Sequence, residues 1–213
     1  MNVVAVVGMK REAKIVASPH VRVGIGRDFQ NRIDETTCGI ISIGIAGALS
    51  PSLQVGDCVV ANDVIATKRF TADDAWSRRM KNLLPRAKPG TILYTFKPIA
   101  SAAEKRALGA SNRADAVDME SGPAVWEAAR LRIPFAVLRV ISDDIGHDLP
   151  PATLVALKPN GDIALGRVMA SVLRNPLQIP ALIRTGRESE KAFAALLRCV
   201  EMLGPGLGCP YLG

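Results

Sequence analysis

A short run of apolar, β-branched residues near the N-terminus constrains the fold of this chain more than any other feature. Val3–Val7 carries no polar side chain and ends at Gly8, which is the pattern of a strand buried on both faces. A strand covered on both sides needs helices on both sides of its sheet, and a helical pattern over Met9–Ala17 follows it directly. The N-terminal residues therefore favour an α/β fold.

Strand-like and helix-like segments alternate along the rest of the chain. The predicted strands are Val21–Ile25, Cys38–Ile45, Asp57–Ala66, Ile92–Phe96, Ala116–Met119 and Phe135–Ile141. The predicted helices are residues 73–84, Ser101–Leu108, Glu120–Leu131 and most of 151–203. Small residues or proline predict turns at 46–48 and 89–90. This order predicts a single domain over residues 1–213, a three-layer α/β/α fold with a central mixed β-sheet and a helical C-terminal part over 151–203.

The composition fits a globular domain with excess positive charge. The chain has 213 residues, of which 48% are hydrophobic and 22% charged, and its formal net charge is +7. Seven basic residues lie from Lys68 to Lys88. The simplest interpretation is a solvated surface. The alternative is a patch that binds anionic lipid or a phosphate group. Because neither interleaved aromatic residues nor a zinc-finger spacing accompanies them, we expect no nucleic acid partner.

The N-terminus and the cysteines favour a cytoplasmic protein. The N-terminal charges follow the apolar stretch, the reverse of a secretory signal, and no apolar run reaches the roughly 20 residues that cross a bilayer. The four cysteines contain no C-x-x-C pair, and His20 and His147 lack ligand-spaced partners, so we expect reduced thiols and no metal. Peripheral contact with a membrane through the basic run stays open.

Acidic and small residues gather where the predicted strands end. Ligands of α/β sheets bind outside the carboxyl ends of the strands. The candidate segments are therefore Gly8–Glu12, Gly44–Gly47, Asp118–Glu120 and Ile141–Asp144. Taken one at a time, these acids have a simpler interpretation as carboxylates that cap or stabilise helix N-termini. Together they suggest a site, because buried acids are costly unless they meet a ligand or a partner.

Four short motifs over residues 1–145 carry a resemblance to a known superfamily. They are M-x-x-E at Met9–Glu12, G-x-A-G-x-L followed by V-G-D-x-V-V, V-D-M-E-S at Val117–Ser121, and V-I-S-D ending at Asp143. In this order they resemble the purine nucleoside phosphorylases and methylthioadenosine/S-adenosylhomocysteine nucleosidases. PIASAAE over Pro98–Glu104, with the tail segments 164–166 and 180–184, is most similar to the hopanoid-associated phosphorylases, which cleave adenosylhopane.

The resemblance implies cleavage of the N-glycosidic bond of a 5′-substituted adenosine, with adenosylhopane as the expected substrate. The products would be adenine and (phospho)ribosylhopane, an intermediate of hopanoid biosynthesis. No cofactor is implied, but inorganic phosphate is expected as a co-substrate, and the protein is expected to be a homo-oligomer.

The resemblance also implies roles for individual residues. Asp143 matches the acid that protonates adenine, for which its pKa has to be raised by its surroundings. Glu120 matches the acceptor of the ribose hydroxyls, whose charge favours a cationic sugar, and Met119 would pack against the ribose. Glu12 matches the base that activates water in the nucleosidases. The remaining substrate-site positions are Ala46, Gly47 and Ser142.

The nucleophile stays open at this stage. Ile45 stands where nucleosidases commonly have a hydroxyl residue beside the attacking water, which favours another nucleophile. Gly26, Arg27 and Arg69 are candidates for holding phosphate, whereas a carboxylate at Glu12 would repel it.

Two alternatives to adenosylhopane cleavage stay open. The first is a hydrolytic nucleosidase of the methylthioadenosine type. The second is a non-catalytic nucleoside- or lipid-binding module at a membrane surface. The helices of residues 164–203 are expected to pack in the core or between subunits, because Phe193 is their only aromatic residue and their basic residues alternate with acids at Glu188 and Glu190.

Overall fold

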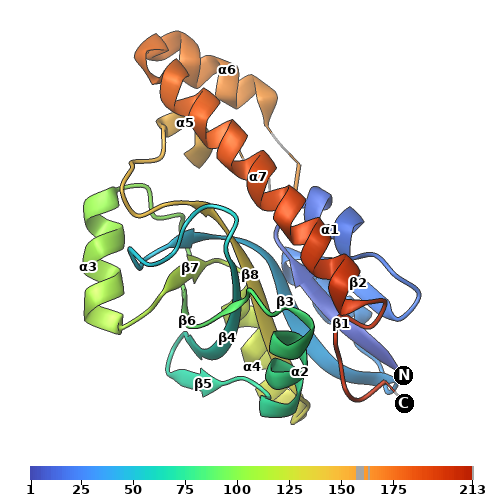
Figure 1. Ribbon diagram of the computed structural model, residues 1–213. Helices are drawn as coiled ribbons and strands as arrows, with labels where there is room; N and C mark the ends of the chain where they lie inside the picture. The colour runs from blue at the N-terminus through green and yellow to red at the C-terminus, as the bar shows by residue number, and fades with distance from the viewer. Residues whose placement is uncertain (157–160, 163, 213) are drawn as a thin grey trace.

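Strand β1 is an inner strand of the sheet, and all of Val3–Val7 is buried, as the apolar run predicts. The computed structural model describes residues 1–156, 161–162 and 164–212 (Figure 1). The strands are β1 Asn2–Val7, β2 Val21–Ile25, β3 Thr37–Ala48, β4 Cys58–Ile65, β5 Arg69–Thr71, β6 Lys88–Tyr94, β7 Ala116–Asp118 and β8 Phe135–Asp143. The helices are α1 Lys10–Val16, α2 Asp74–Leu83, α3 Ala102–Asn112, α4 Ser121–Leu131, α5 Pro151–Leu154, α6 Leu165–Arg174 and α7 Ile179–Leu203, with 3-10 helices η1 Gly26–Arg32 and η2 Pro176–Gln178.

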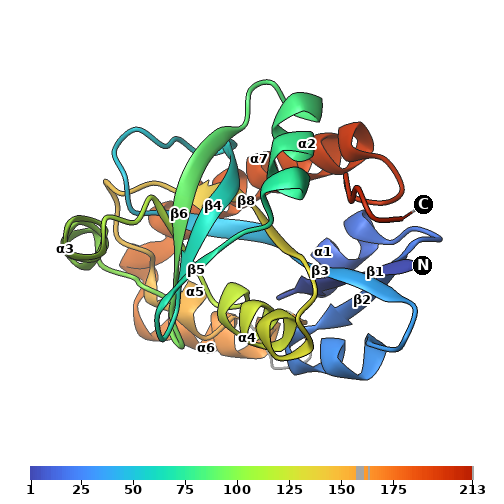
Figure 2. The same cartoon turned by 90° about the horizontal axis from the view of Figure 1, so that it is seen from below.

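The sheet is mixed and partly closes on itself. Its strands follow the order β2-β1-β3-β7-β6-β4-β5, and β8 pairs with β3 in parallel and with β4 antiparallel. Strands β3, β7, β6, β4 and β8 therefore form a closed circuit of pairings, from which β1 and β2 extend on one side (Figure 2). This closure brings the ends of β1, β3, β7 and β8 to one region of the molecule.

Helices cover both faces of the strands. Along Val3–Val7 the odd-numbered side chains pack into a cluster with α1, α2 and α7, and the even-numbered ones pack with α4 and η1. Trp76 of α2 and Phe193 of α7 are large members of the first cluster, and Phe29 of η1 is the largest of the second. The predicted α/β fold with a mixed central sheet is thereby confirmed.

Several predictions of local structure are wrong. Residues 46–48 do not turn but continue β3, because Gly47 and Ala48 pair with β7. Pro89 and Gly90 lie inside β6, opposite Val60 and Ala61 of β4. Strand β5 and helix η1 were not predicted, and no described residue of α6 is buried, so α6 does not pack in the core.

The basic run from Lys68 to Lys88 is spread over β5, α2 and β6. Three of its members pair with aspartates: Arg69 with Asp63, Arg78 with Asp74, and Lys88 with Asp57. Three of its seven positive charges are thus balanced locally, which supports a solvated surface over a dedicated anion-binding patch.

Trp76 ties α2 to the C-terminal segment and provides a test of the packing. Its indole Nε1 donates to the Leu207 carbonyl oxygen at 3.0 Å inside the core. We expect Trp76→Phe to lower the free energy of unfolding by about 1–3 kcal/mol, because the buried carbonyl loses its partner. Trp126→Phe is the matched control, since Trp126 Nε1 has no partner among the described residues. Equal losses in urea denaturation would contradict this role of the hydrogen bond.

Candidate active site

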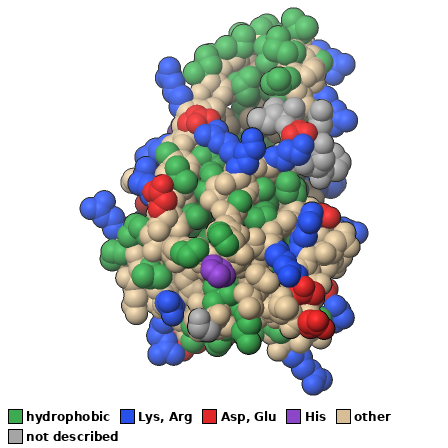
Figure 3. Space-filling model, turned by 90° about the vertical axis from the view of Figure 1, so that its right-hand side faces the viewer, with side chains coloured by type: hydrophobic (Ala, Val, Ile, Leu, Met, Phe, Trp, Pro, Cys, Tyr) green, Lys and Arg blue, Asp and Glu red, His purple; other side chains and the backbone are tan. Residues whose placement is uncertain are grey.

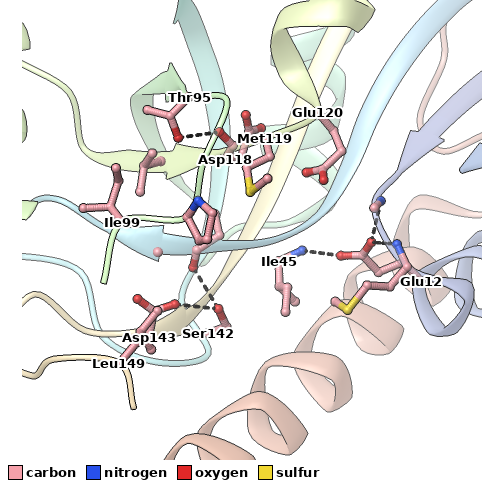
Figure 4. A pocket seen from close by; sticks show the side chains of 16 residues that line it. Glu12, Ile45, Thr95, Ile99, Asp118, Met119, Glu120, Ser142, Asp143 and Leu149 are labelled. Carbon is pink, nitrogen blue, oxygen red and sulfur yellow. Dashed lines mark hydrogen bonds between the residues drawn. The ribbon is translucent and has the colours of Figure 1, made fainter. Parts of the chain in front are cut away.

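A cavity of about 210 Å³ opens where β1, β3, β7 and β8 end. Figure 4 shows Glu12 on one side of it, Asp143 on the other, and Met119 and Glu120 between them. The predicted substrate-site positions from β3 and β8 also line it: Ala46, Gly47 and Ser142. Apolar side chains make up much of the remaining wall: Met9, Ile45, Pro98, Ile99, Val117 and Leu149.

Glu12 is held by backbone donors from the turn after β1 and from β3. Its Oε2 accepts from the N–H groups of Gly8 and Met9 at 2.8 and 2.9 Å, and its Oε1 accepts from the Ile45 N–H at 2.8 Å. The residue is buried. The carboxylate therefore does more than stabilise the start of α1, because it joins that turn to the end of β3.

Two glycines make room for these carboxylates. A Cβ at Gly44 would lie 2.3 Å from Glu12 Oε1 and 2.8 Å from an Arg139 nitrogen. A Cβ at Gly8 would lie 2.5 Å from Glu120 Oε1. At both positions any Cβ would collide with the buried charged groups. Glycine is therefore needed so that the backbone can pass close to them.

Arg139 of β8 lies at the centre of the acidic groups and is fully buried. Its Nε donates to Asp118 Oδ2 at 2.6 Å, and its Nη2 donates to the Ser42 hydroxyl. The same Nη2 lies 3.8 Å from Glu120 Oε2. Nη1 has no hydrogen-bond partner among the described residues, so both of its N–H groups are available to a ligand or water.

One guanidinium faces three carboxylates, those of Glu12, Asp118 and Glu120. Burial raises the pKa of Glu12, against the lowering effects of Arg139 and of the backbone donors. Burial, with the charges of Asp118 and Glu12, raises the pKa of Glu120 to about 7, against the effect of Arg139. On this side of the cavity three acidic side chains therefore face one guanidinium, and burial favours the protonated forms of Glu12 and Glu120.

Asp143 has polar partners on both oxygens. Lys105 of α3, which is fully buried, donates from Nζ to Asp143 Oδ2 and to the Asp144 carbonyl oxygen at 2.8 Å. The Ser142 hydroxyl donates to Asp143 Oδ1 at 2.9 Å. A buried ammonium and a hydroxyl group therefore fix the orientation of this carboxyl group.

The sequence interpretation missed Arg139, Lys105 and Ser42, and it assigned no role to Asp118. A signal was present for Arg139, because a single arginine interrupts the otherwise apolar run Phe135–Ile141. Lys105 has no such signal, since α3 also carries exposed charges.

The candidate phosphate residues do not come together. Gly26 and Arg27 line a second cavity of about 320 Å³, which shares Met119 and Glu120 with the first. Arg69 lies on β5, at the other edge of the sheet from β2, where it pairs with Asp63. The first cavity therefore has only Arg139 and Lys105 as cations close to the site carboxylates, among the residues that the structure describes.

Over residues 1–156, 161–162 and 164–212, no group of three or more potential ligands could hold a metal ion. Within the same ranges, no helix has the length and apolar character needed to cross a bilayer.

Known proteins share this fold. A family profile described as the phosphorylase superfamily matches residues 36–174, whereas no curated protein matches the chain. The 5′-methylthioadenosine/S-adenosylhomocysteine nucleosidase of Neisseria meningitidis, in complex with methylthio-immucillin-A, has a TM-score of 0.68 at 16% identity, over 95% of this chain and 98% of that one. Futalosine hydrolase of Helicobacter pylori has a TM-score of 0.67 at 14% identity, over 95% and 97%. The corresponding nucleosidase of Helicobacter pylori has a TM-score of 0.62 at 15% identity, over 94% and 98%.

Replacement of Arg139 tests the central ion cluster. We expect Arg139→Met to lower the free energy of unfolding at pH 7 by about 3–5 kcal/mol, because buried carboxylates lose their counter-charge. The loss should shrink toward pH 5, where these carboxylates take up protons. Arg130→Met is the matched control, because Arg130 pairs with Glu127 at the surface. The free energy of unfolding of this variant should barely differ from that of the wild type. Urea denaturation at both pH values measures this, and a pH-independent loss would argue against the electrostatic role.

The raised pKa of Glu120 predicts a pH effect of definite sign. Between the ordinary value of 4.5 and about 7, the folded protein keeps a proton that the unfolded chain has lost. The free energy of unfolding therefore falls as pH rises through this window. Glu120→Gln lacks this titration. The free energy of unfolding of the variant minus that of the wild type should therefore rise by about 1–3 kcal/mol as pH goes from 4.5 to about 7.

Glu127→Gln is the control for this titration, since Arg130 lowers the pKa of Glu127. It should show no such increase when urea denaturation is followed from pH 4.5 to 7.5. Parallel stability profiles for Glu120→Gln and the wild type would refute the raised pKa.

Proposed function

This chain belongs to the phosphorylase superfamily, and we propose that within it the protein hydrolyses the N-glycosidic bond of a 5′-substituted adenosine. One observation carries the proposal: a single pocket places Glu12 and Asp143 on opposite sides of Met119 and Glu120. This arrangement offers a base for the nucleophile, an anion for the sugar and a proton donor for the departing adenine. The similar solved structures are those of nucleosidases and a futalosine hydrolase, which supports the same class of reaction.

Asp143 serves the departing base in this proposal. Adenine is a poor leaving group as an anion, and protonation of a ring nitrogen lets it leave neutral. Lys105 and Ser142 orient the carboxyl group through hydrogen bonds to its two oxygens. In this proposal the Lys105–Asp143 pair passes a proton to the base as the bond breaks.

Glu120 and Met119 serve the sugar. The transition state of glycosidic cleavage resembles an oxocarbenium ion, so a nearby carboxylate stabilises it more than the ground state. Glu120 is ionised above its pKa of about 7 and can accept hydrogen bonds from ribose hydroxyls. Met119 lies beside it and is 37% exposed, so its side chain is available to pack against the ribose.

Water is the nucleophile that the charges favour. Phosphate would enter a region where three carboxylates face one guanidinium, and this repulsion opposes its role as co-substrate. A neutral water molecule meets no such barrier. The raised pKa of Glu12 suits it to accept a proton from that water as the water attacks the sugar.

The apolar wall supports an apolar 5′-substituent, and we propose adenosylhopane as the substrate. The cavity of about 210 Å³ is smaller than the roughly 300–1,000 Å³ of pockets that enclose drug-sized ligands, so a hopane tail would extend outside it. The same size supports a second candidate substrate, a small nucleoside such as methylthioadenosine.

Release of adenine tests both substrates and both nucleophiles. The protein is incubated with adenosylhopane or methylthioadenosine, with and without phosphate, and adenine and the sugar product are quantified by chromatography. We expect adenine and an unphosphorylated sugar at a rate that phosphate does not change. Asp143→Asn should lower kcat/KM by about 10²–10⁴-fold. Asp57→Asn, at a surface ion pair with Lys88, is the control that should retain activity.

The outcomes discriminate between the two nucleophiles, between the two substrates, and between an enzyme and a binding module. Adenine release that requires phosphate would replace hydrolysis by phosphorolysis. Absence of adenine from either substrate would overturn the proposed enzyme and favour a nucleoside- or lipid-binding module. Faster turnover of methylthioadenosine than of adenosylhopane would assign the smaller substrate.

A further inference from the structure

The helices α6 and η2 and the first turns of α7 project from the body of the molecule (Figure 1). We call residues 165–183 the apolar protrusion. Five of its large apolar side chains are between 51% and 89% exposed: Leu165, Met169, Leu173, Leu177 and Ile183. A surface of this kind marks a site of interaction with a protein or a membrane.

The exposed side chains belong to a defined face. Leu165, Met169 and Leu173 are spaced four residues apart on α6, so they share one side of the helix. Buried Gln178 fixes the arrangement, because its Oε1 accepts from the Ala152 N–H at 2.9 Å and its Nε2 donates to the Ser171 carbonyl oxygen at 2.8 Å. The apolar face is therefore held outward by specific contacts.

The protrusion carries positive charge only. Its charged residues are Arg167 and Arg174, whereas Arg184, just beyond it, lies 3.9 Å from Glu188. Figure 3 shows hydrophobic side chains gathered at the far end of the molecule, with basic side chains beside and below them. An apolar face flanked by arginines is complementary to an anionic bilayer, which offers acyl chains beneath a layer of phosphates.

We propose that the apolar protrusion docks onto an anionic membrane surface. Its aliphatic side chains enter the boundary between headgroups and acyl chains, and its arginines contact lipid phosphates. A second copy of this chain is a poorer occupant, because a two-fold contact between equal faces would bring arginines together without acidic partners from the protrusion. Residues 165–183 contain no aromatic residue, which by itself argues against an interfacial helix. The exposed aliphatic face is the stronger observation, because it provides the apolar surface that would enter the bilayer boundary.

The protrusion also begins beside the catalytic cavity. Leu149 lines the cavity just before α5, and Lys10, next to Met9 of the cavity wall, pairs with Asp162 just before α6. The Lys10 N–H also donates to the Gly161 carbonyl oxygen at 3.2 Å. Docking through the protrusion would thus bring the cavity close to the membrane, although the docking proposal does not depend on the proposed reaction.

Vesicle flotation tests the docking. The full chain is mixed with vesicles of phosphatidylcholine alone or of equal parts phosphatidylcholine and phosphatidylglycerol, at low and high NaCl. We expect flotation with the anionic vesicles at low salt, and a loss of most of it at high salt or without phosphatidylglycerol. The combined Arg167→Gln and Arg174→Gln change should weaken partitioning by about 25-fold, from about fivefold for each charge.

Replacement of the apolar face provides the decisive variants. Met169→Asp with Leu173→Asp should reduce flotation to less than about a tenth of the wild-type value, since charged side chains resist entry into the bilayer boundary. Leu197→Asp with Met202→Asp is the matched control, because these residues are also exposed on α7 but lie toward its other end, and it should float like the wild type. Circular dichroism checks that both variants fold.

A gain-of-signal variant keeps the test informative if the aspartate variants fail to fold. The fluorescence of Leu173→Trp should shift to shorter wavelength when anionic vesicles are added. Absence of that shift, or flotation that the aspartate pair does not alter, would overturn the proposal. So would a wild-type oligomer in sedimentation velocity that the aspartate pair dissociates, because a second copy would then cover the face. Adenine release from soluble methylthioadenosine is measured separately, so failure of docking and failure of the enzyme are distinguishable.

Discussion

The buried guanidinium of Arg139 is the interaction on which the rest of the site depends. It contacts Asp118 at the end of β7 and Ser42 of β3, and its charge acts on Glu12 of α1 and Glu120 before α4. Without it, the carboxylates would be buried without a counter-charge, which strongly destabilises a fold. Because these groups come from separate strands and helices, the contacts that join Arg139 of β8 to β7 and β3 also position the acidic side chains of the site.

The imbalance within this cluster determines which reaction it suits. Burial raises the pKa values of Glu12 and Glu120, the charges of Asp118 and Glu12 add to the rise for Glu120, and three acids there face one arginine. Such a site stabilises a developing cation on the sugar and provides a base, but it opposes an incoming phosphate dianion. At the other end Lys105 balances Asp143, so the two ends of the pocket differ in charge. This asymmetry supports the proposed division of roles, with proton acceptance at Glu12 and proton delivery at the Lys105–Asp143 pair.

The sequence predicts the parts of the fold that follow from local pattern. Val21–Ile25 is found with the predicted bounds, and the motif residues around Glu12, Glu120 and Asp143 line one cavity, because the ends of neighbouring strands meet there. The extension of β3 over residues 46–48 depends on partners from β7, which no local pattern reveals. The burial of Lys105 likewise depends on Asp143, which lies 38 residues further along the chain. The outward face of α6 depends on the contacts of Gln178 with α5 and α6.

The small cavity and the apolar protrusion both bear on how a substrate with a large apolar tail could bind without exposing that tail to water. A pocket of about 210 Å³ can hold the adenosine part of a ligand but not a large apolar tail as well. Drawing such a tail from a bilayer into water would expose its apolar surface, at a cost of about 25 cal/mol for each Å². An enzyme that rests on the membrane through an aliphatic face beside its cavity avoids that cost, because the tail can stay among acyl chains while the nucleoside enters the pocket. Few aromatic residues are then needed, since an alicyclic tail requires aliphatic surroundings and no stacking surface.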